Sequence, residues 1–137
     1  MGRCVITLDT SGLLALLNRR DPDHGRVNAA LDSDPGPYLV PAGILAEITY
    51  MVEQRLGLDT LDLFLQDLES SAYQLECGQE DLARIRVLIA RYADLPLGFA
   101  DASVVACAER SGGRVLTLDV RDFGVVAREG RILILPD

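Results

Sequence analysis

The chain has 137 residues, 49% of them hydrophobic, so we expect one domain with a buried core over residues 1–137. Its 21 acidic and 13 basic residues give a formal net charge of −8, which argues against nonspecific electrostatic binding of nucleic acid by the bare chain. Divalent cations held by some of the acids would offset part of this charge.

The cysteine content and the absence of long apolar runs bear on the compartment. Cys4, Cys77 and Cys107 are odd in number and have no paired spacing of the kind that binds metals. We therefore expect reduced thiols in a cytoplasmic protein. The sequence opens without a basic segment and a following apolar run, so no signal peptide is expected. No apolar run is long enough to cross a membrane.

Strand-like and helix-like patterns alternate along the chain. In chain order we expect strand 4–8, a helix entered through 9–12, helix 22–32, strand 38–40, helix 41–56, helical spacing over 61–68, strand 72–75, helix 82–92, helix 100–110, and buried strands 115–118 and 132–135. Continuously apolar strands that alternate with helices are typical of parallel sheets covered on both faces. The predicted fold class is three-layer α/β/α, with a central, mainly parallel sheet of four to five strands.

Two aspartates follow predicted strands directly. Asp9 follows the first strand and Asp119 follows the strand at 115–118. In open α/β sheets, ligands bind beyond the carboxyl ends of the strands, so both acids are expected at the edge where chemistry takes place. Each could instead serve as a turn residue or helix N-cap.

Two further acids lie on apolar helix faces. The positions three and four residues from Glu47 are Gly43, Ile44, Tyr50 and Met51. An acid buried there needs a partner, which could be a cation or an arginine. Asp101 precedes Val104 and Val105 at helical spacing, although an aspartate also suits the first turn of a helix.

If these four acids meet, their like charges oppose one another's ionisation. A divalent cation between them would make the cluster tolerable. Ligands that are all oxygen, without histidine or cysteine, suit hard ions such as Mg²⁺ or Mn²⁺. The sequence thus favours a metal site built from Asp9, Glu47, Asp101 and Asp119.

The ordered set of motifs along the chain resembles that of the PIN-domain nucleases. It comprises Leu8-Asp9-Thr10-Ser11, Glu47, Ala100-Asp101-Ala102 and the run from Thr117 to Phe123. The segment 94–102 looks particularly like VapC toxins. The resemblance extends over essentially the whole chain and implies a PIN-like fold, with Asp9, Glu47, Asp101 and Asp119 as catalytic and metal-binding residues.

The resemblance also implies supporting residues around the acids. Ser11 and Thr117 match hydroxyl positions that support the carboxylates, although both could be capping or strand hydroxyls. Asp122 is expected as a contributing acid, with Asp119 favoured as the more direct ligand because it follows the strand immediately. Arg19, Arg20, Arg55 and Arg121 are candidate phosphate contacts, with a purely solvated role left open.

By the same resemblance, the expected activity is that of an endoribonuclease that cuts structured RNA, such as tRNA or rRNA loops, by metal-activated hydrolysis. The products would carry 5′-phosphate and 3′-hydroxyl ends. The implied partners are the RNA substrate, a VapB-like antitoxin that inserts an arginine among the acids, and a second copy of the chain in a homodimer.

Several other classes of protein share part of this pattern. A PIN nuclease of RNA maturation and a PIN-like scaffold that binds without cutting both stay open. A phosphatase of the haloacid dehalogenase type would need a second aspartate at position 11, where this chain has Ser11, and also a lysine, of which the chain has none. A receiver domain would also need a lysine, so it is excluded for the same reason. The sequence contains no phosphate-binding loop motif either.

Overall fold

The computed structural model describes residues 5–136 and has a five-stranded sheet at its centre, with all strands parallel and in the order β3-β2-β1-β4-β5. The strands are β1 (Ile6–Leu8), β2 (Tyr38–Pro41), β3 (Gln74–Glu76), β4 (Arg114–Leu116) and β5 (Leu133–Leu135). The predicted parallel α/β fold is confirmed. Cys4, which the sequence placed in the first strand, lies outside the described residues.

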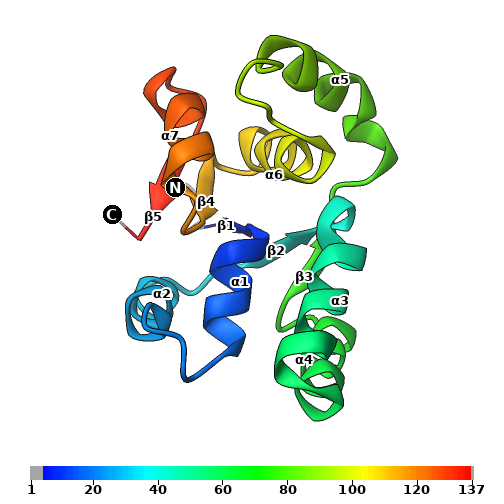
Figure 1. Ribbon diagram of the computed structural model, residues 1–137, viewed down its shortest axis with the longest axis vertical. Coiled ribbons are helices and arrows are strands. Elements are labelled where there is room, and N and C mark those ends of the chain that lie inside the picture. Colours follow the sequence, from blue (N-terminus) through cyan, green and yellow to red (C-terminus); the bar gives the residue numbers. More distant parts are fainter. Residues whose placement is uncertain (1–4, 137) are drawn as a thin grey trace.

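Helices cover both faces of this sheet (Figure 1). One layer contains α1 (Thr10–Leu17), α2 (His24–Asp32), α3 (Leu45–Leu56) and α4 (Leu58–Glu69); the other contains α5 (Leu82–Arg91), α6 (Phe99–Glu109) and α7 (Val120–Arg128). Short 3₁₀ turns, η1 (Ala42–Ile44) and η2 (Gln79–Asp81), precede α3 and α5. The prediction of three layers is confirmed.

The two layers follow from the direction in which the chain crosses the sheet. From β1 the chain moves outward to β2 and β3, and from β3 it returns to the far side of β1 to form β4 and then β5. Because crossovers between parallel strands are right-handed, reversing the direction moves the connecting helices to the opposite face. The reversal leaves a crevice between the carboxyl ends of β1 and β4, where ligands bind in such folds.

The main apolar core lies between the sheet and the helices. It includes Ile6 and Leu8 of β1, Val115 and Leu116 of β4, and most of α6, whose residues from Ala102 to Ala108 are all buried. The central strands are therefore mostly apolar and buried, as predicted, with Thr7 of β1 as a buried polar residue and Arg114 at the start of β4. The outermost strand β5 differs from the prediction of a buried strand, because at the sheet edge Leu133 is 68% exposed.

Two other expectations are wrong in detail. Pro41 ends β2 instead of starting a helix, and η1 separates it from α3. Cys77 and Cys107, expected as reduced thiols, form a disulfide, because the chain brings the residue after β3 against α6. Across the described chain, no helix has both the length and the apolar character needed to cross a bilayer.

Candidate active site

The four acids singled out from the sequence line one open pocket of about 420 Å³. Asp9 follows β1, Glu47 lies on α3, Asp101 lies in the first turn of α6, and Asp119 precedes α7. The pocket thus opens at the carboxyl ends of β1 and β4, where the chain reverses its direction across the sheet. The geometry brings together acids that are distant in sequence.

Asp9 is the most deeply buried of these acids, with 4% of its surface exposed. One carboxylate oxygen, Oδ2, accepts hydrogen bonds from the hydroxyls of Ser11 and Thr117, each at 2.8 Å. Burial raises the pKa of the Asp9 carboxyl above its ordinary value, and the two hydroxyl donors act against that increase. Asp9 is therefore held in one orientation by its neighbours.

Ser11 and Thr117 also tie the two central strand ends together. Their hydroxyl oxygens lie 3.1 Å apart, and the Ser11 hydroxyl accepts from the backbone N–H of Leu118 at 2.9 Å. Thr117 likewise accepts from the backbone N–H of Asp119 at 3.0 Å. The predicted supporting hydroxyls thus contact both the Asp9 carboxylate and the backbone that leads to Asp119.

Glu47 differs from the sequence-based expectation of a buried acid. Its side chain is exposed at the pocket rim, and its Oε1 accepts a hydrogen bond of 2.6 Å from the Thr10 hydroxyl. Ile44 and Ile48 face the core, whereas Glu47 and Tyr50 lie on the solvent-exposed side of the same segment. The alternative of an arginine partner is not observed among residues 5–136.

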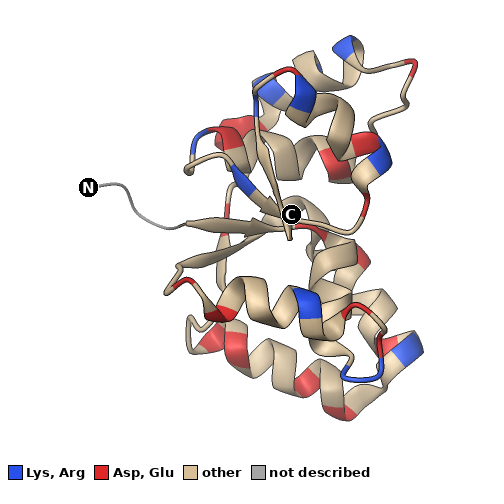
Figure 2. Ribbon diagram, turned by 90° about the vertical axis from the view of Figure 1, so that its left-hand side faces the viewer, with Lys and Arg blue, Asp and Glu red and all other residues tan. Residues whose placement is uncertain are grey.

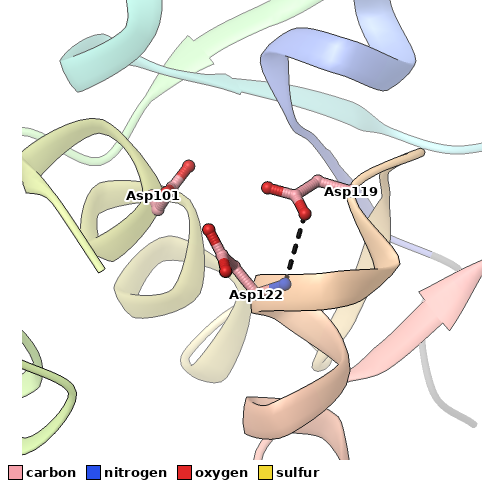
Figure 3. A group of neighbouring side chains, drawn as sticks. All are labelled: Asp101, Asp119 and Asp122. Atoms are coloured by element: carbon pink, nitrogen blue, oxygen red, sulfur yellow. Dashed lines mark hydrogen bonds between the residues drawn. The ribbon is translucent and has the colours of Figure 1, made fainter. Parts of the chain in front are cut away.

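Asp101, Asp119 and Asp122 form the tightest group of acids, shown in Figure 3. Each offers one carboxylate oxygen, and these oxygens all lie within 4.8 Å of one another. Asp119 also caps α7, because its Oδ1 accepts from the Asp122 backbone N–H at 3.2 Å. Asp119 and Asp122 therefore both face Asp101. Asp119 is both the N-cap of α7, the alternative role expected from the sequence, and a member of this acidic group.

The electrostatic consequence of this grouping is clear at Asp101. Burial, followed by the charges of Asp9, Asp119, Asp122 and Glu47, raises the pKa of its carboxyl from 3.8 to about 7. Within the part of the chain that the structure describes, no arginine pairs with any of these acids to relieve the repulsion. The group is built of like charges, and the described residues supply no counter-ion to it.

This donor set fits a hard divalent cation. The ligand atoms on offer are carboxylate oxygens alone, which Mg²⁺ and Mn²⁺ prefer, and their mutual approach is close enough for one ion to contact all three. A cation there would also remove the repulsion that raises the Asp101 pKa. Asp9 and Glu47 line the same pocket and could add to the set.

Three of the four predicted arginines gather beside the acids. Arg19, Arg20 and Arg55 line a neighbouring pocket of about 790 Å³ between α1, α3 and α4, and Arg55 also lines the acidic pocket. All three are exposed, and none forms an ion pair with a described carboxylate. Arg121 is exposed on α7 and lines neither pocket.

In Figure 2, acidic positions are spread along the ribbons of both helical layers, and arginine positions occur in both layers as well. Sequence reasoning did not assign to the site five residues that line the acidic pocket: Thr10, Leu14, Asp21, Met51 and Leu118. Thr10 could have been found, because it lies between two residues already assigned to the site. Asp21 lies in a loop after α1, and no periodic pattern indicates where such a loop folds back.

The comparisons with known proteins agree with this geometry. A family model described as the PIN domain matches residues 6–129. The chain is 34% identical over 133 residues to Ribonuclease VapC26 of Mycobacterium tuberculosis, covering 94% of this chain and 98% of that protein.

Solved structures with the same fold include toxin and toxin–antitoxin proteins. VapC20 of Mycobacterium tuberculosis, called a toxin that cleaves the sarcin–ricin loop, has a TM-score of 0.76 at 20% identity, covering 88% of this chain and 94% of that one. VapBC2 of Rickettsia felis, bound to promoter DNA, has a TM-score of 0.68 at 16% identity, covering 95% and 96%. The resemblance inferred from the sequence is confirmed, and the chain belongs to the PIN domain family, among its VapC-like members.

Proposed function

We propose that this protein is a metal-dependent endoribonuclease. The observation that carries the proposal is the group of Asp101, Asp119 and Asp122, whose carboxylate oxygens approach within 4.8 Å of one another without an arginine to pair them in the described chain. Such a group is costly to keep unless a cation binds it. The 34% identity to a ribonuclease over most of the chain supports the same activity.

The acids and the hydroxyl groups at the pocket have separate parts in this activity. Asp101, Asp119 and Asp122 would hold Mg²⁺ or Mn²⁺, with Asp9 and Glu47 completing the acidic wall. Ser11 and Thr117 keep the Asp9 carboxylate in one orientation through their hydrogen bonds, and Thr10 does the same for Glu47. When bound, the ion supplies positive charge that stabilises the phosphodiester in the transition state and activates water for attack.

The substrate we propose is structured RNA cut in an exposed loop, such as a loop of tRNA or rRNA. Sequence in RNA is read mostly where bases are unpaired. Arg55, which lines both pockets, and Arg19 and Arg20 beyond it offer phosphate contacts that lead away from the acids. Arg121 offers another contact from α7. These positive side chains give the acidic molecule a local surface for RNA.

We further propose that the protein acts in the cytoplasm as the toxin of a VapBC-type pair, as a homodimer held inactive by a VapB-like antitoxin. Support comes from the VapC name of its relative and the VapBC complex among its structural neighbours. An antitoxin arginine inserted among the five acids would provide the counter-ion that residues 5–136 do not.

Cleavage of RNA by the purified protein tests the nuclease proposal. With Mg²⁺ or Mn²⁺ we expect cleavage of tRNA or rRNA to 5′-phosphate and 3′-hydroxyl ends, and loss of cleavage in excess chelator. Asp9→Asn and Asp101→Asn should abolish cutting while circular dichroism and melting show an intact fold. Asp62→Asn removes an exposed acid of α4 and serves as the matched control, with full activity expected. Cleavage that persists in Asp101→Asn would remove that residue from the site.

The toxin proposal needs a test in cells. Induced expression should arrest growth, Asp101→Asn should not, and coexpression of the neighbouring small open reading frame should restore growth. Sequencing RNA 5′ ends from arrested cells would identify the target. Efficient cleavage in vitro without growth arrest would instead point to a nuclease of RNA maturation.

A further inference from the structure

The aromatic residues of this chain are divided between the core and the surface near the acidic pocket. The chain has four tyrosines, three phenylalanines and no tryptophan. Five of these seven are buried or half-buried. The two exposed ones are Tyr50, 66% exposed, and Phe99, 51% exposed. Both lie beside pocket acids: Tyr50 is three residues after Glu47 on α3, and Phe99 is two residues before Asp101 on α6.

Contacts place the Phe99 ring next to the start of α3. A Cβ built on Gly43 would lie 3.3 Å from Cε2 of Phe99, so one edge of the ring packs against η1. Gly43 lies in η1, four residues before Glu47, and Tyr50 follows Glu47 by three residues on α3. The Phe99 ring therefore lies at the turn that leads into α3, before Glu47 in the chain, and Tyr50 lies about one helical turn after Glu47.

The spacing of this pair indicates what could bind. Seven residues along a helix correspond to about 10 Å, whereas stacked bases of one strand are only about 3.4 Å apart. Bases that reach both rings must therefore be separated from each other, as they are in an unpaired, splayed segment. Exposed aromatic rings beside a nucleic-acid site are the groups on which such bases stack.

We infer that Tyr50 and Phe99 form a base clamp, in which each ring stacks one base of the nucleotides on either side of the cleaved bond. The inference rests on the proposed ribonuclease function and specifies its substrate as single-stranded at the cut. Stacking tolerates any base, so the clamp selects unpaired nucleotides and positions the phosphodiester over Glu47 and Asp101, while sequence preference must come from other contacts.

Tryptophan fluorescence tests the clamp directly, because the chain has no tryptophan of its own. The probe is a short single-stranded RNA of randomised sequence, added in Ca²⁺, a second hard cation with oxygen ligands. Phe99→Trp and Tyr50→Trp should each show saturable quenching. Val87→Trp replaces a 53% exposed residue of α5 and should show none. An abasic strand of the same length keeps the phosphates and should leave all three unquenched.

Substitutions that keep or remove the ring give a second measurement. Phe99→Leu and Tyr50→Leu should each weaken RNA binding by roughly 5- to 100-fold. Phe99→Tyr and Tyr50→Phe should retain near-native affinity, because the stacking surface remains. Leucine at position 99 keeps the apolar contact with η1. A higher KM or a weaker affinity for RNA, with an unchanged melting temperature, therefore separates stacking from a structural role.

Three results would overturn the inference. If the native chain cleaves RNA and both leucine variants do so with unchanged KM and kcat, the clamp is wrong while the nuclease proposal stands. If the native chain neither binds nor cleaves RNA, both fail. If the emission of the tryptophan variants depends on protein concentration and not on RNA, the two rings belong to an interface between copies of the chain.

Discussion

At the scale of single residues, Asp101 couples the charge of the pocket to protein stability. Its carboxyl is desolvated and faces four other carboxylates, so the folded protein holds a proton there up to a pKa of about 7. In the unfolded chain the same group loses its proton near its ordinary pKa of 3.8. Unfolding therefore releases a proton between these values, and the contribution of Asp101 to stability falls as pH rises through that window. The raised pKa of the buried Asp9 acts in the same direction.

We predict that Asp101→Asn makes the metal-free protein more stable at pH 8, because the variant has no ionised carboxylate at that position to repel the others. At pH 5 the folded protein still holds the Asp101 proton and only the lower part of the window above pH 3.8 has been crossed, so the gain of the variant should be much smaller than at pH 8. Thermal melts in chelator at the two pH values measure the difference. Glu53→Gln, which removes one charge from an exposed position of α3, is the matched control and should show no such pH-dependent gain.

Adding Mg²⁺ at pH 8 should reverse the order, because a cation that binds the folded state stabilises it by RT ln(1 + c/Kd), where c is the free Mg²⁺ concentration. The native protein should then gain more than Asp101→Asn. Equal gains in both proteins would mean that the ion binds elsewhere.

At the scale of elements, the site depends on how closely α1 approaches β4. A Cβ on Gly12 would lie 2.5 Å from the carbonyl oxygen of Leu116. This close contact lets the first turn of α1, with Ser11, reach Thr117 beyond the end of β4. Because the obstacle is backbone within the sheet, it cannot turn aside as a flexible side chain would.

Gly12→Ala should therefore destabilise the protein by about 1–3 kcal/mol through overpacking. Gly25→Ala is the contrasting control: it lies in α2 with no atom within 4 Å of an added Cβ, and should be neutral or stabilising by up to about 1 kcal/mol. Urea denaturation of both variants measures the effect. A Gly12→Ala protein as stable as the native one would show that α1 can shift without cost.

Elements were also what the sequence predicted best. The apolar runs of β1 and β4 and the acids that follow them are local patterns, so the positions of Asp9 and Asp119 could be foreseen. The exposure of Glu47 could not be predicted, because its neighbours at helical spacing include both core residues and surface residues. The clustering of Arg19, Arg20 and Arg55 depends on the packing of α1 against α3 and α4, which no local pattern encodes.

At the scale of the whole molecule, distant segments are brought together by the crossing pattern of the sheet and by one covalent bond. The hydrogen bond from Thr117 to Asp9 joins residues 108 positions apart. The disulfide joins Cys77, which follows β3, to Cys107 of α6, the helix that begins beside Asp101. Arg110, at the C-terminal end of α6 near Cys107, forms ion pairs with Glu80 and Asp81.

The disulfide should stabilise the fold mainly by restricting the unfolded chain. It closes a loop of 30 residues, for which the loss of chain entropy corresponds to about 3–4 kcal/mol. We predict that a strong reductant lowers the urea midpoint of the native protein markedly. The double variant Cys77→Ser, Cys107→Ser should start at the lower value and not respond to reductant, which also controls for any effect at Cys4.

Thiol titration in denaturant checks the bond without reference to stability. Of the three cysteines, one should react before reduction and all three after it. Three reactive thiols in the untreated protein would favour the reduced state expected from the sequence. A midpoint that is unchanged by reduction, in a protein with one reactive thiol, would mean instead that the packing of Cys77 and Cys107 against Val5 and Leu39 holds this end of α6 in place without the bond.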